Sequence, residues 1–210
     1  MVFDRSQPPG LGESFMFPLS TRAARTDLLV GGTALILLLP LGWVLNMGHR
    51  LDVVERVFHG HRPYFRGFAP WPLTLLRGLH ATAAILIYLS PSALCATAHW
   101  QGVPFLALPG LLLFFVAIYA LPGGMTYNAA HRDISYLYRP DRALRRAIAG
   151  GRHYLRAWGI ALLAICLSSL GILGLGVGFF YTSVWAWMVV GYAFSRALSL
   201  RQATCLDDAS

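Results

Sequence analysis

Long apolar runs separated by basic segments dominate the hydrophobic pattern of this chain. The runs cover residues 28–47, 73–98, 103–121 and 158–198. An apolar helix of about 18 or more residues spans the roughly 30 Å of hydrocarbon in a bilayer, because it satisfies its own backbone hydrogen bonds there. The last run is about twice the length that one span requires, so we expect two helices with a turn near residues 176–182, where glycines occur. The pattern predicts an all-α integral membrane bundle with four to five membrane segments.

The first run has Pro40 in its middle and allows two topologies. Three arginines precede it, four follow it before the second run, and seven lie between Pro122 and Arg156, whereas the two short turns between apolar helices carry none. Basic segments stay on the cytoplasmic side of a membrane. Five crossings would leave the N-terminal arginines on the outside, whereas a broken hairpin that enters and returns would keep them inside with the others. We favour five crossings and keep the hairpin as the alternative, and both place the arginine-rich loops in the cytoplasm.

Two basic connecting segments are expected to form amphipathic interfacial helices. In residues 51–59 an apolar face separates from a charged face, and Asp141 can cap a second helix whose arginines face lipid headgroups. The Pro122-Gly123-Gly124 string is expected to stop the third membrane helix before this region. The apolar positions are Leu51, Val54, Val57 and Phe58 in the first helix, opposite Asp52, Glu55, Arg56 and His59, and Leu144, Ala147 and Ile148 in the second, opposite Arg142, Arg145 and Arg146.

Composition supports a membrane environment and removes several function classes. Of the 210 residues 56% are hydrophobic and 12% charged, and the 17 basic residues are all arginines, giving a formal net charge of +8. These arginines flank apolar runs and do not interleave with aromatic residues on a polar surface, so we expect no nucleic acid partner. Cys95, Cys166 and Cys205 have no metal-binding spacing, and we expect no metal and no cofactor.

We divide the chain into an N-terminal cytoplasmic or interfacial segment (1–27), a helical membrane domain (28–198) and a polar C-terminal tail (199–210), and we see no cleavable signal.

Ionisable residues inside apolar runs are the first candidates for function, because hydrocarbon penalises their charge. Arg77 and His80 qualify, and their spacing of three places them on neighbouring faces of one helix, where they could line a cavity. The alternative is that Arg77 lies close enough to the helix start for its side chain to reach the headgroups.

A second polar cluster follows the third apolar run. Helical spacing brings Asn128, His131 and Arg132 together, with Asp133 beside them, and a histidine that titrates near neutrality could serve acid–base chemistry. The alternative is structural, with Asp133 paired to Arg132 or Arg139 to seat the loop. Near the last turn, Gly174 and Gly178 form a small-xxx-small pair of the kind that lets membrane helices approach closely.

Several short strings, taken in order, resemble a family of prokaryotic multi-pass membrane proteins known only as a domain of unknown function. The resemblance covers nearly the whole chain and implies a plasma (inner) membrane location and a common architecture, but it implies no activity. That family usually places acidic residues just before the loop tryptophan, and this chain has none there, which puts any role of those acids in doubt. The matching strings are Gly31-Gly32, Gly42-Trp43, His49-Arg50, Trp71, Arg77-Gly78-Leu79, Leu86-Ile87-Tyr88-Leu89-Ser90-Pro91, Leu121-Pro122-Gly123-Gly124-Met125 and Gly191-Tyr192.

The sequence therefore favours a non-enzymatic membrane protein. Polar groups inside the runs are too few to line a convincing pathway, so we expect a structural or accessory component that packs against other membrane helices, with the bilayer and a membrane protein or a second copy as partners. The alternative is a small permease or channel-like protein with a polar site near Arg77 and His80.

Overall fold

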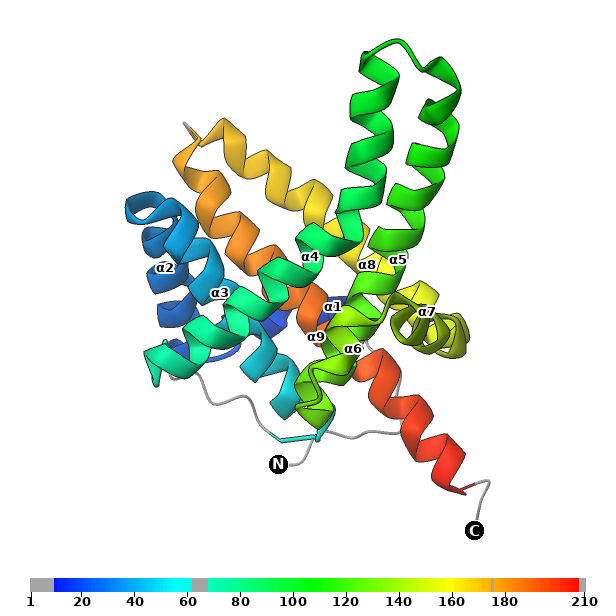
Figure 1. Ribbon diagram of the computed structural model, residues 1–210. Helices are drawn as coiled ribbons and strands as arrows, with labels where there is room; N and C mark the ends of the chain where they lie inside the picture. The colour runs from blue at the N-terminus through cyan, green and yellow to red at the C-terminus, as the bar shows by residue number, and fades with distance from the viewer. Residues whose placement is uncertain (1–9, 62–67, 175, 208–210) are drawn as a thin grey trace.

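All elements that the computed structural model describes are helices (Figure 1). The description covers residues 10–61, 68–174 and 176–207, with side chains up to residue 200. Helices long and apolar enough to cross a membrane occupy Trp71–Trp100, Pro104–His131, Gly151–Leu173 and Val177–Leu200. The predicted all-α membrane bundle is confirmed. The elements are α1 (Leu11–Met16), η1 (Phe17–Leu19), α2 (Arg22–Leu37), α3 (Leu39–Phe58), α4 (Trp71–Trp100), η2 (Pro104–Leu106), α5 (Ala107–His131), α6 (Ser135–Tyr138), α7 (Pro140–Ala149), α8 (Gly151–Ser169), η3 (Leu170–Leu173) and α9 (Val177–Asp207).

The first apolar run folds back on itself as the hairpin α2–α3. Leu38 leaves the helical conformation, with φ −131° and ψ 41°, and Pro40 lies in the first turn of α3, where a missing backbone N–H is tolerated. Asn46 ties the two arms together, because its side-chain amide donates to the carbonyl oxygens of Gly31 (3.1 Å) and Gly42 (2.7 Å). The run is therefore not one continuous helix, as the favoured arrangement of five crossings had assumed, and it has the shape of the hairpin alternative.

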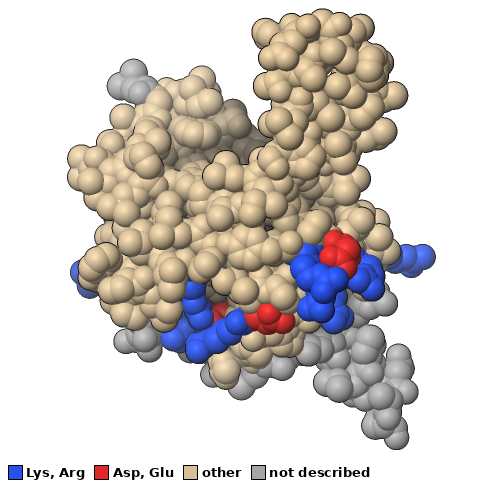
Figure 2. Space-filling view, in the orientation of Figure 1, with Lys and Arg blue, Asp and Glu red and all other residues tan. Residues whose placement is uncertain are grey.

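The turns of the hairpins α2–α3, α4–α5 and α8–α9 all lie at one end of the molecule (Figure 1). The visible charged side chains gather toward the opposite end, and the surface around the turns is uncharged (Figure 2). Because α2 and α3 form a hairpin, Arg22 and Arg25 at the start of α2 lie toward the same end of the molecule as the arginines of the later connecting segments. The hairpin thus removes the conflict with the expected charge asymmetry that five crossings created.

Cysteine labelling can test this topology in a background without Cys95, Cys166 and Cys205. We expect Ser20→Cys and His61→Cys, both at exposed positions, to react with a membrane-impermeant maleimide from one side of the bilayer. Gln101→Cys, in the α4–α5 turn, should react only from the other side. Labelling of Ser20→Cys and Gln101→Cys from the same side would restore the arrangement with five crossings.

The turn between the last two long helices lies slightly earlier than predicted. Gly176, with φ +77°, precedes the start of α9 at Val177, so residues 177–182 belong to the helix. Gly174 lies in the turn and Gly178 in the first turn of α9, where a Cβ atom on Gly178 would lie 2.6 Å from the carbonyl oxygen of Gly171. The close approach at Gly178 is thus to η3 across the turn.

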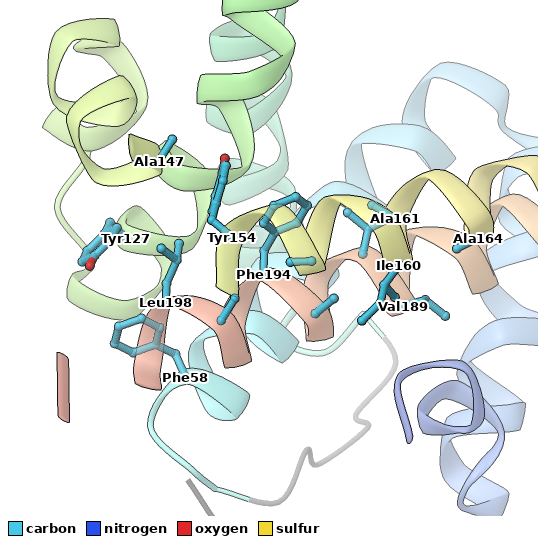
Figure 3. Close-up of a cluster of buried hydrophobic side chains, with 14 of the residues drawn as sticks. Phe58, Tyr127, Ala147, Tyr154, Ile160, Ala161, Ala164, Val189, Phe194 and Leu198 are labelled. Carbon is cyan, nitrogen blue, oxygen red and sulfur yellow. The ribbon is translucent and has the colours of Figure 1, made fainter. Parts of the chain in front are cut away.

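The largest buried cluster joins α3, α5, α7, α8 and α9 (Figure 3). Aromatic rings from three of these helices meet there, with Phe58, Tyr154 and Phe194 at most 4% exposed, and the Tyr154 hydroxyl donates to the carbonyl oxygen of Tyr119 at 2.5 Å. Small residues along α8 and α9, such as Ala157 and Ala193, let these helices pack closely. This cluster connects the α8–α9 hairpin to α3 and α5, and so to the other two hairpins.

The helix α5 continues through Pro122-Gly123-Gly124 to His131, so the predicted stop at this string is wrong. The glycines serve packing instead: a Cβ atom would lie 3.1 Å from the carbonyl oxygen of Ala143 at Gly123, and 2.8 Å from that of Tyr136 at Gly124. The short helices α6 and α7 therefore lie directly on α5. Ala147, predicted to face lipid, is fully buried in this contact, whereas Ile148 is 62% exposed.

Two glycines mark the point where α3 crosses α4. A Cβ atom on Gly48 would lie 1.8 Å from the carbonyl oxygen of Thr74, and one on Gly78 would lie 1.8 Å from that of Val44. Beyond this crossing the predicted apolar face of residues 51–59 is confirmed, because Leu51, Val54 and Val57 are at most 3% exposed. This face is the second half of α3 and not a separate interfacial helix.

Candidate functional site

The crossing of α3 and α4 brings Arg77 against two carboxylates on α3. Arg77 donates through Nη1 to Asp52 and to Glu55, with 2.9 Å to Glu55 Oε2. Arg132, at the end of α5, donates through Nε to Glu55 Oε1 at 2.9 Å, and its Nη2 forms an ion pair with the same oxygen at 2.9 Å. Glu55 therefore lies between two guanidinium groups. We call these four residues, Asp52, Glu55, Arg77 and Arg132, the charge clamp.

The charge clamp is largely shielded from solvent on three of its four side chains. Arg77 is 19% exposed, Asp52 30% and Glu55 18%, whereas Arg132 is 71% exposed. Arg77 is therefore not an isolated side chain that reaches toward the headgroups. Its ion pairs join α4 to α3 at the charged end of the bundle. Opposite charges held at this depth attract more strongly than they do in water.

Two cavities adjoin the charge clamp. The larger, of about 350 Å³, is lined by the clamp together with other polar residues, such as His49 in α3 and His59 just after it. The smaller, of about 120 Å³, also touches Arg77 and Arg132 and extends to His80 and Asn128. The structure thus brings together four of the six residues that the sequence singled out for a polar site: Arg77, His80, Asn128 and Arg132.

The polar groups around the smaller cavity are engaged in structural contacts. His80 Nδ1 lies 2.9 Å from the hydroxyl oxygen of Tyr138 in α6, and the Asn128 amide donates to the carbonyl oxygen of Asp133 at 3.0 Å. His131 is exposed, and its ring stacks on that of Tyr127 with 5.7 Å between centroids. These contacts join α4 to α6 and fix the residues that follow α5.

The structural alternative predicted that Asp133 pairs with Arg132 or Arg139. This prediction is wrong. Its carboxylate accepts the backbone N–H of Ser135 at 2.9 Å, and hydrogen bonds from Ser135 hold the pKa of Asp133 below its ordinary value. Arg132 has a left-handed backbone, with φ 54°, and its side chain reaches α3, while Arg139 pairs with Asp141 at 3.2 Å. Both arginines therefore have other partners.

Sequence reasoning missed a second set of buried ionisable residues inside the α2–α3 hairpin. Asp27 and His49 are 7% and 6% exposed, and Asp27 Oδ2 lies 3.4 Å from His49 Nε2. Beside them the Arg50 guanidinium lies 4.8 Å above the Trp187 ring, and burial lowers the pKa of Arg50 to about 10, so it stays cationic at neutral pH. Asp27 opens the first apolar run, which was the available signal, but its partner is apparent only once the run is known to fold back.

The arrangement of the charge clamp suits holding helices together better than binding a charged ligand. Two carboxylates face two guanidinium groups, so the four side chains neutralise one another. Within the described residues, no group of three or more His, Cys, Asp or Glu side chains is placed to hold a metal ion.

Comparison with known proteins agrees with the resemblance seen in the sequence. The sequence model of a family described as a protein of unknown function, DUF4013, matches residues 32–177. No curated protein and no solved structure matches the chain.

Proposed function

The chain belongs to the DUF4013 family, whose function is unknown, and from this premise we propose that it is a non-enzymatic accessory component that packs against other membrane helices. Its four apolar helices fit a membrane protein. We further propose that this membrane is the plasma membrane of a prokaryote, with the arginine-rich segments in the cytoplasm, because arginines are concentrated at one end of the bundle.

The observation that carries the accessory role is the apolar outer half of the hairpin α4–α5. This half stands away from the rest of the bundle (Figure 1), and the most apolar windows of its helices are 22% and 17% buried within the chain, against 50% for α9. Large apolar side chains on it are exposed, including Leu94 at 69% and Leu108 at 65%. In a membrane such a surface meets either lipid or another helix.

A groove along this hairpin favours a helix as the occupant. It has a volume of about 510 Å³ and contains the small residues Ala93, Ala96, Ala107 and Gly110, flanked by larger apolar side chains. Membrane helices approach one another most closely over such small residues, because dispersion contacts between backbones replace those with lipid. The occupant that fits is therefore an apolar helix of another membrane protein.

The bend in α4 at Pro91 (Figure 1) is compatible with this role, because the carbonyl oxygen that Pro91 cannot bond has another donor. Pro91 lacks the N–H that would bond to the carbonyl oxygen of Ile87, and the Ser90 hydroxyl donates to that oxygen at 2.8 Å instead. A bent helix without an unsatisfied carbonyl can face hydrocarbon or a partner helix equally well.

The alternative, a small permease with a site near Arg77 and His80, has weaker support. Its candidate cavities lie at the charged end of the bundle, and the guanidinium groups that would attract a solute are already paired with Asp52 and Glu55. A transport site at the membrane midplane would require polar groups along the apolar halves of the helices.

Adding bulk to the groove provides the test. In mild detergent we expect the wild-type protein to retain a stoichiometric membrane-protein partner, detected by native mass spectrometry. Ala93→Leu with Ala96→Leu should lower that recovery roughly tenfold, because overfilling a packed contact costs at least about 1.4 kcal/mol. Gly159→Leu is the matched control, since a Cβ atom at this exposed position of α8 would meet nothing within 4 Å.

Two results would contradict the accessory role. One is a wild-type protein that leaves the membrane as a monomer with lipid alone when it is extracted in native nanodiscs. The other is equal loss of the partner in Gly159→Leu and in the groove variant. Solute flux into vesicles that His80→Ala abolishes without unfolding the protein would instead establish the permease alternative.

A further inference from the structure

A further cavity, which shares no lining residue with the charge clamp, lies over the short helices α6 and α7. It has a volume of about 480 Å³ and is lined by Tyr136, Arg139, Arg142, Arg145, Arg146 and Ala149. Arginines thus provide four of the six lining residues. The cavity shares no lining residue with the groove on α4–α5, so a ligand in the cavity would bind independently of the proposed partner helix.

The positive charge of this cavity is only partly compensated. Asp141 accepts hydrogen bonds from Arg139 (3.2 Å, from Nη2) and Arg145 (2.8 Å). These bonds, of which the one from Arg145 has the larger effect, hold the pKa of Asp141 below its ordinary value. Even with Asp133, whose pKa responds to the charge of Arg142, the arginines outnumber the carboxylates.

The two remaining arginines are held by uncharged groups, so their charge is available to a ligand. Arg142 donates to the Ser135 hydroxyl at 3.0 Å, and the Arg146 guanidinium lies 4.8 Å from the centroid of the Tyr127 ring. Both contacts orient a guanidinium group without neutralising it. A planar donor fixed in this way is suited to the oxygens of a phosphate group.

The surroundings of the cavity indicate that its ligand has an apolar part. Ile148, which precedes the lining residue Ala149 on α7, is 62% exposed, and Leu155 on the following helix α8 is 60% exposed. In Figure 2 the blue and red group over α6 and α7 borders directly on uncharged surface toward the end that carries the hairpin turns. Charged and apolar surfaces meet in this way at the level of lipid headgroups.

We propose that this cavity binds the phosphate group of an anionic phospholipid, with Arg142 and Arg146 as its main donors. Arg139 and Arg145, shared with Asp141, complete the rim. The acyl chains lie along the exposed apolar side chains of α7 and α8. Specific occupancy at this position would fix the depth of α7 in the interface beyond what general attraction to an anionic surface provides.

Native mass spectrometry of the full chain in a neutral detergent, titrated with phosphatidylglycerol or phosphatidylcholine, tests this site. We expect saturable binding of phosphatidylglycerol, and a roughly tenfold weaker affinity for Arg142→Gln with Arg146→Gln, because each arginine near anionic lipid contributes measurably. The matched control is Arg152→Gln with Arg156→Gln, which removes the same charge from exposed positions of α8 outside the cavity. An equal loss in both double variants would overturn the proposal in favour of diffuse attraction.

A gain of binding separates the site from simple misfolding. Asp141→Asn removes the carboxylate that competes for Arg139 and Arg145, and we expect it to bind phosphatidylglycerol severalfold more tightly. Arg145→Gln, at a position 74% exposed, should weaken binding without lowering the melting temperature. Unchanged affinity for phosphatidylglycerol in Asp141→Asn and in Arg145→Gln would refute the site, even if the variant with Arg142→Gln and Arg146→Gln failed to fold.

Inorganic phosphate distinguishes a lipid site from a site for a soluble anion. We expect phosphate at millimolar concentration to leave phosphatidylglycerol bound, because it lacks the apolar contacts to Ile148 and Leu155. Displacement of the lipid by phosphate alone would show that the cavity recognises a free anion and would overturn the assignment to phospholipid.

Discussion

Replacing Gly48 or Gly78 with alanine should destabilise the protein by about 3 kcal/mol, near the upper end for overpacked contacts. The new Cβ atom would lie 1.8 Å from a backbone carbonyl oxygen of the facing helix, Thr74 for Gly48 and Val44 for Gly78. Backbone cannot move aside as a side-chain tip can, so α3 and α4 must separate. Thermal unfolding in detergent should show a melting temperature lower by roughly 10 °C.

The control for this prediction is Gly159→Ala on α8. Nothing lies within 4 Å of a Cβ atom there, so alanine adds helix propensity without a clash and should stabilise the protein by up to about 1 kcal/mol. If Gly48→Ala and Gly78→Ala melted at the wild-type temperature, the close crossing of α3 and α4 would be wrong.

Removal of the Arg77 side chain should have an effect of similar size. Arg77→Met keeps the apolar stem but leaves Asp52 facing Glu55 without the guanidinium that separates them. Loss of one partner from a buried ion pair costs about 3 to 5 kcal/mol, and partial exposure of this group places the expected loss near the lower limit. The melting temperature in detergent provides the measurement, and Arg152→Met, at an exposed position of α8, should change it little.

Neutralising the carboxylates distinguishes the charge clamp from a simple packing effect. In the Arg77→Met background, Asp52→Asn with Glu55→Gln should restore part of the lost stability, because Asp52 then no longer places an unpaired carboxylate beside that of Glu55. If the stability losses of Arg77→Met and of the two carboxylate substitutions simply added in the combined variant, Arg77 would not act through Asp52 and Glu55.

The hydrophobic pattern predicts the long helices well, because hydrocarbon demands a continuous apolar helix. It cannot decide the fate of residues 28–47, since a helix with a central proline can either bend and cross or break and return. The amide of Asn46, which bonds to Gly31, decides this through a contact that a local pattern does not contain. The predicted stop at Pro122 failed for a related reason: tertiary packing of α6 and α7 on Gly123 and Gly124 requires an unbroken α5.

For the candidate site, the sequence identifies the costly charge but not its partner. Arg77 is conspicuous because it is an arginine in an apolar run, whereas Asp52 and Glu55 resemble the solvated face of an ordinary amphipathic helix. Their meeting depends on Gly48 and Gly78, which let two helices cross at backbone contact. Small residues in an apolar segment give no indication of which other segment they will meet.

The shared direction of the hairpins has a consequence for how the chain enters the bilayer. The turns near residues 38, 102 and 176 carry no Asp, Glu or Arg, so in the proposed orientation these uncharged stretches are the ones that enter or cross the hydrocarbon. Each pair of helices can insert together, with its guanidinium groups remaining on the side where they were synthesised. Biogenesis in this form requires no step in which an arginine is translocated.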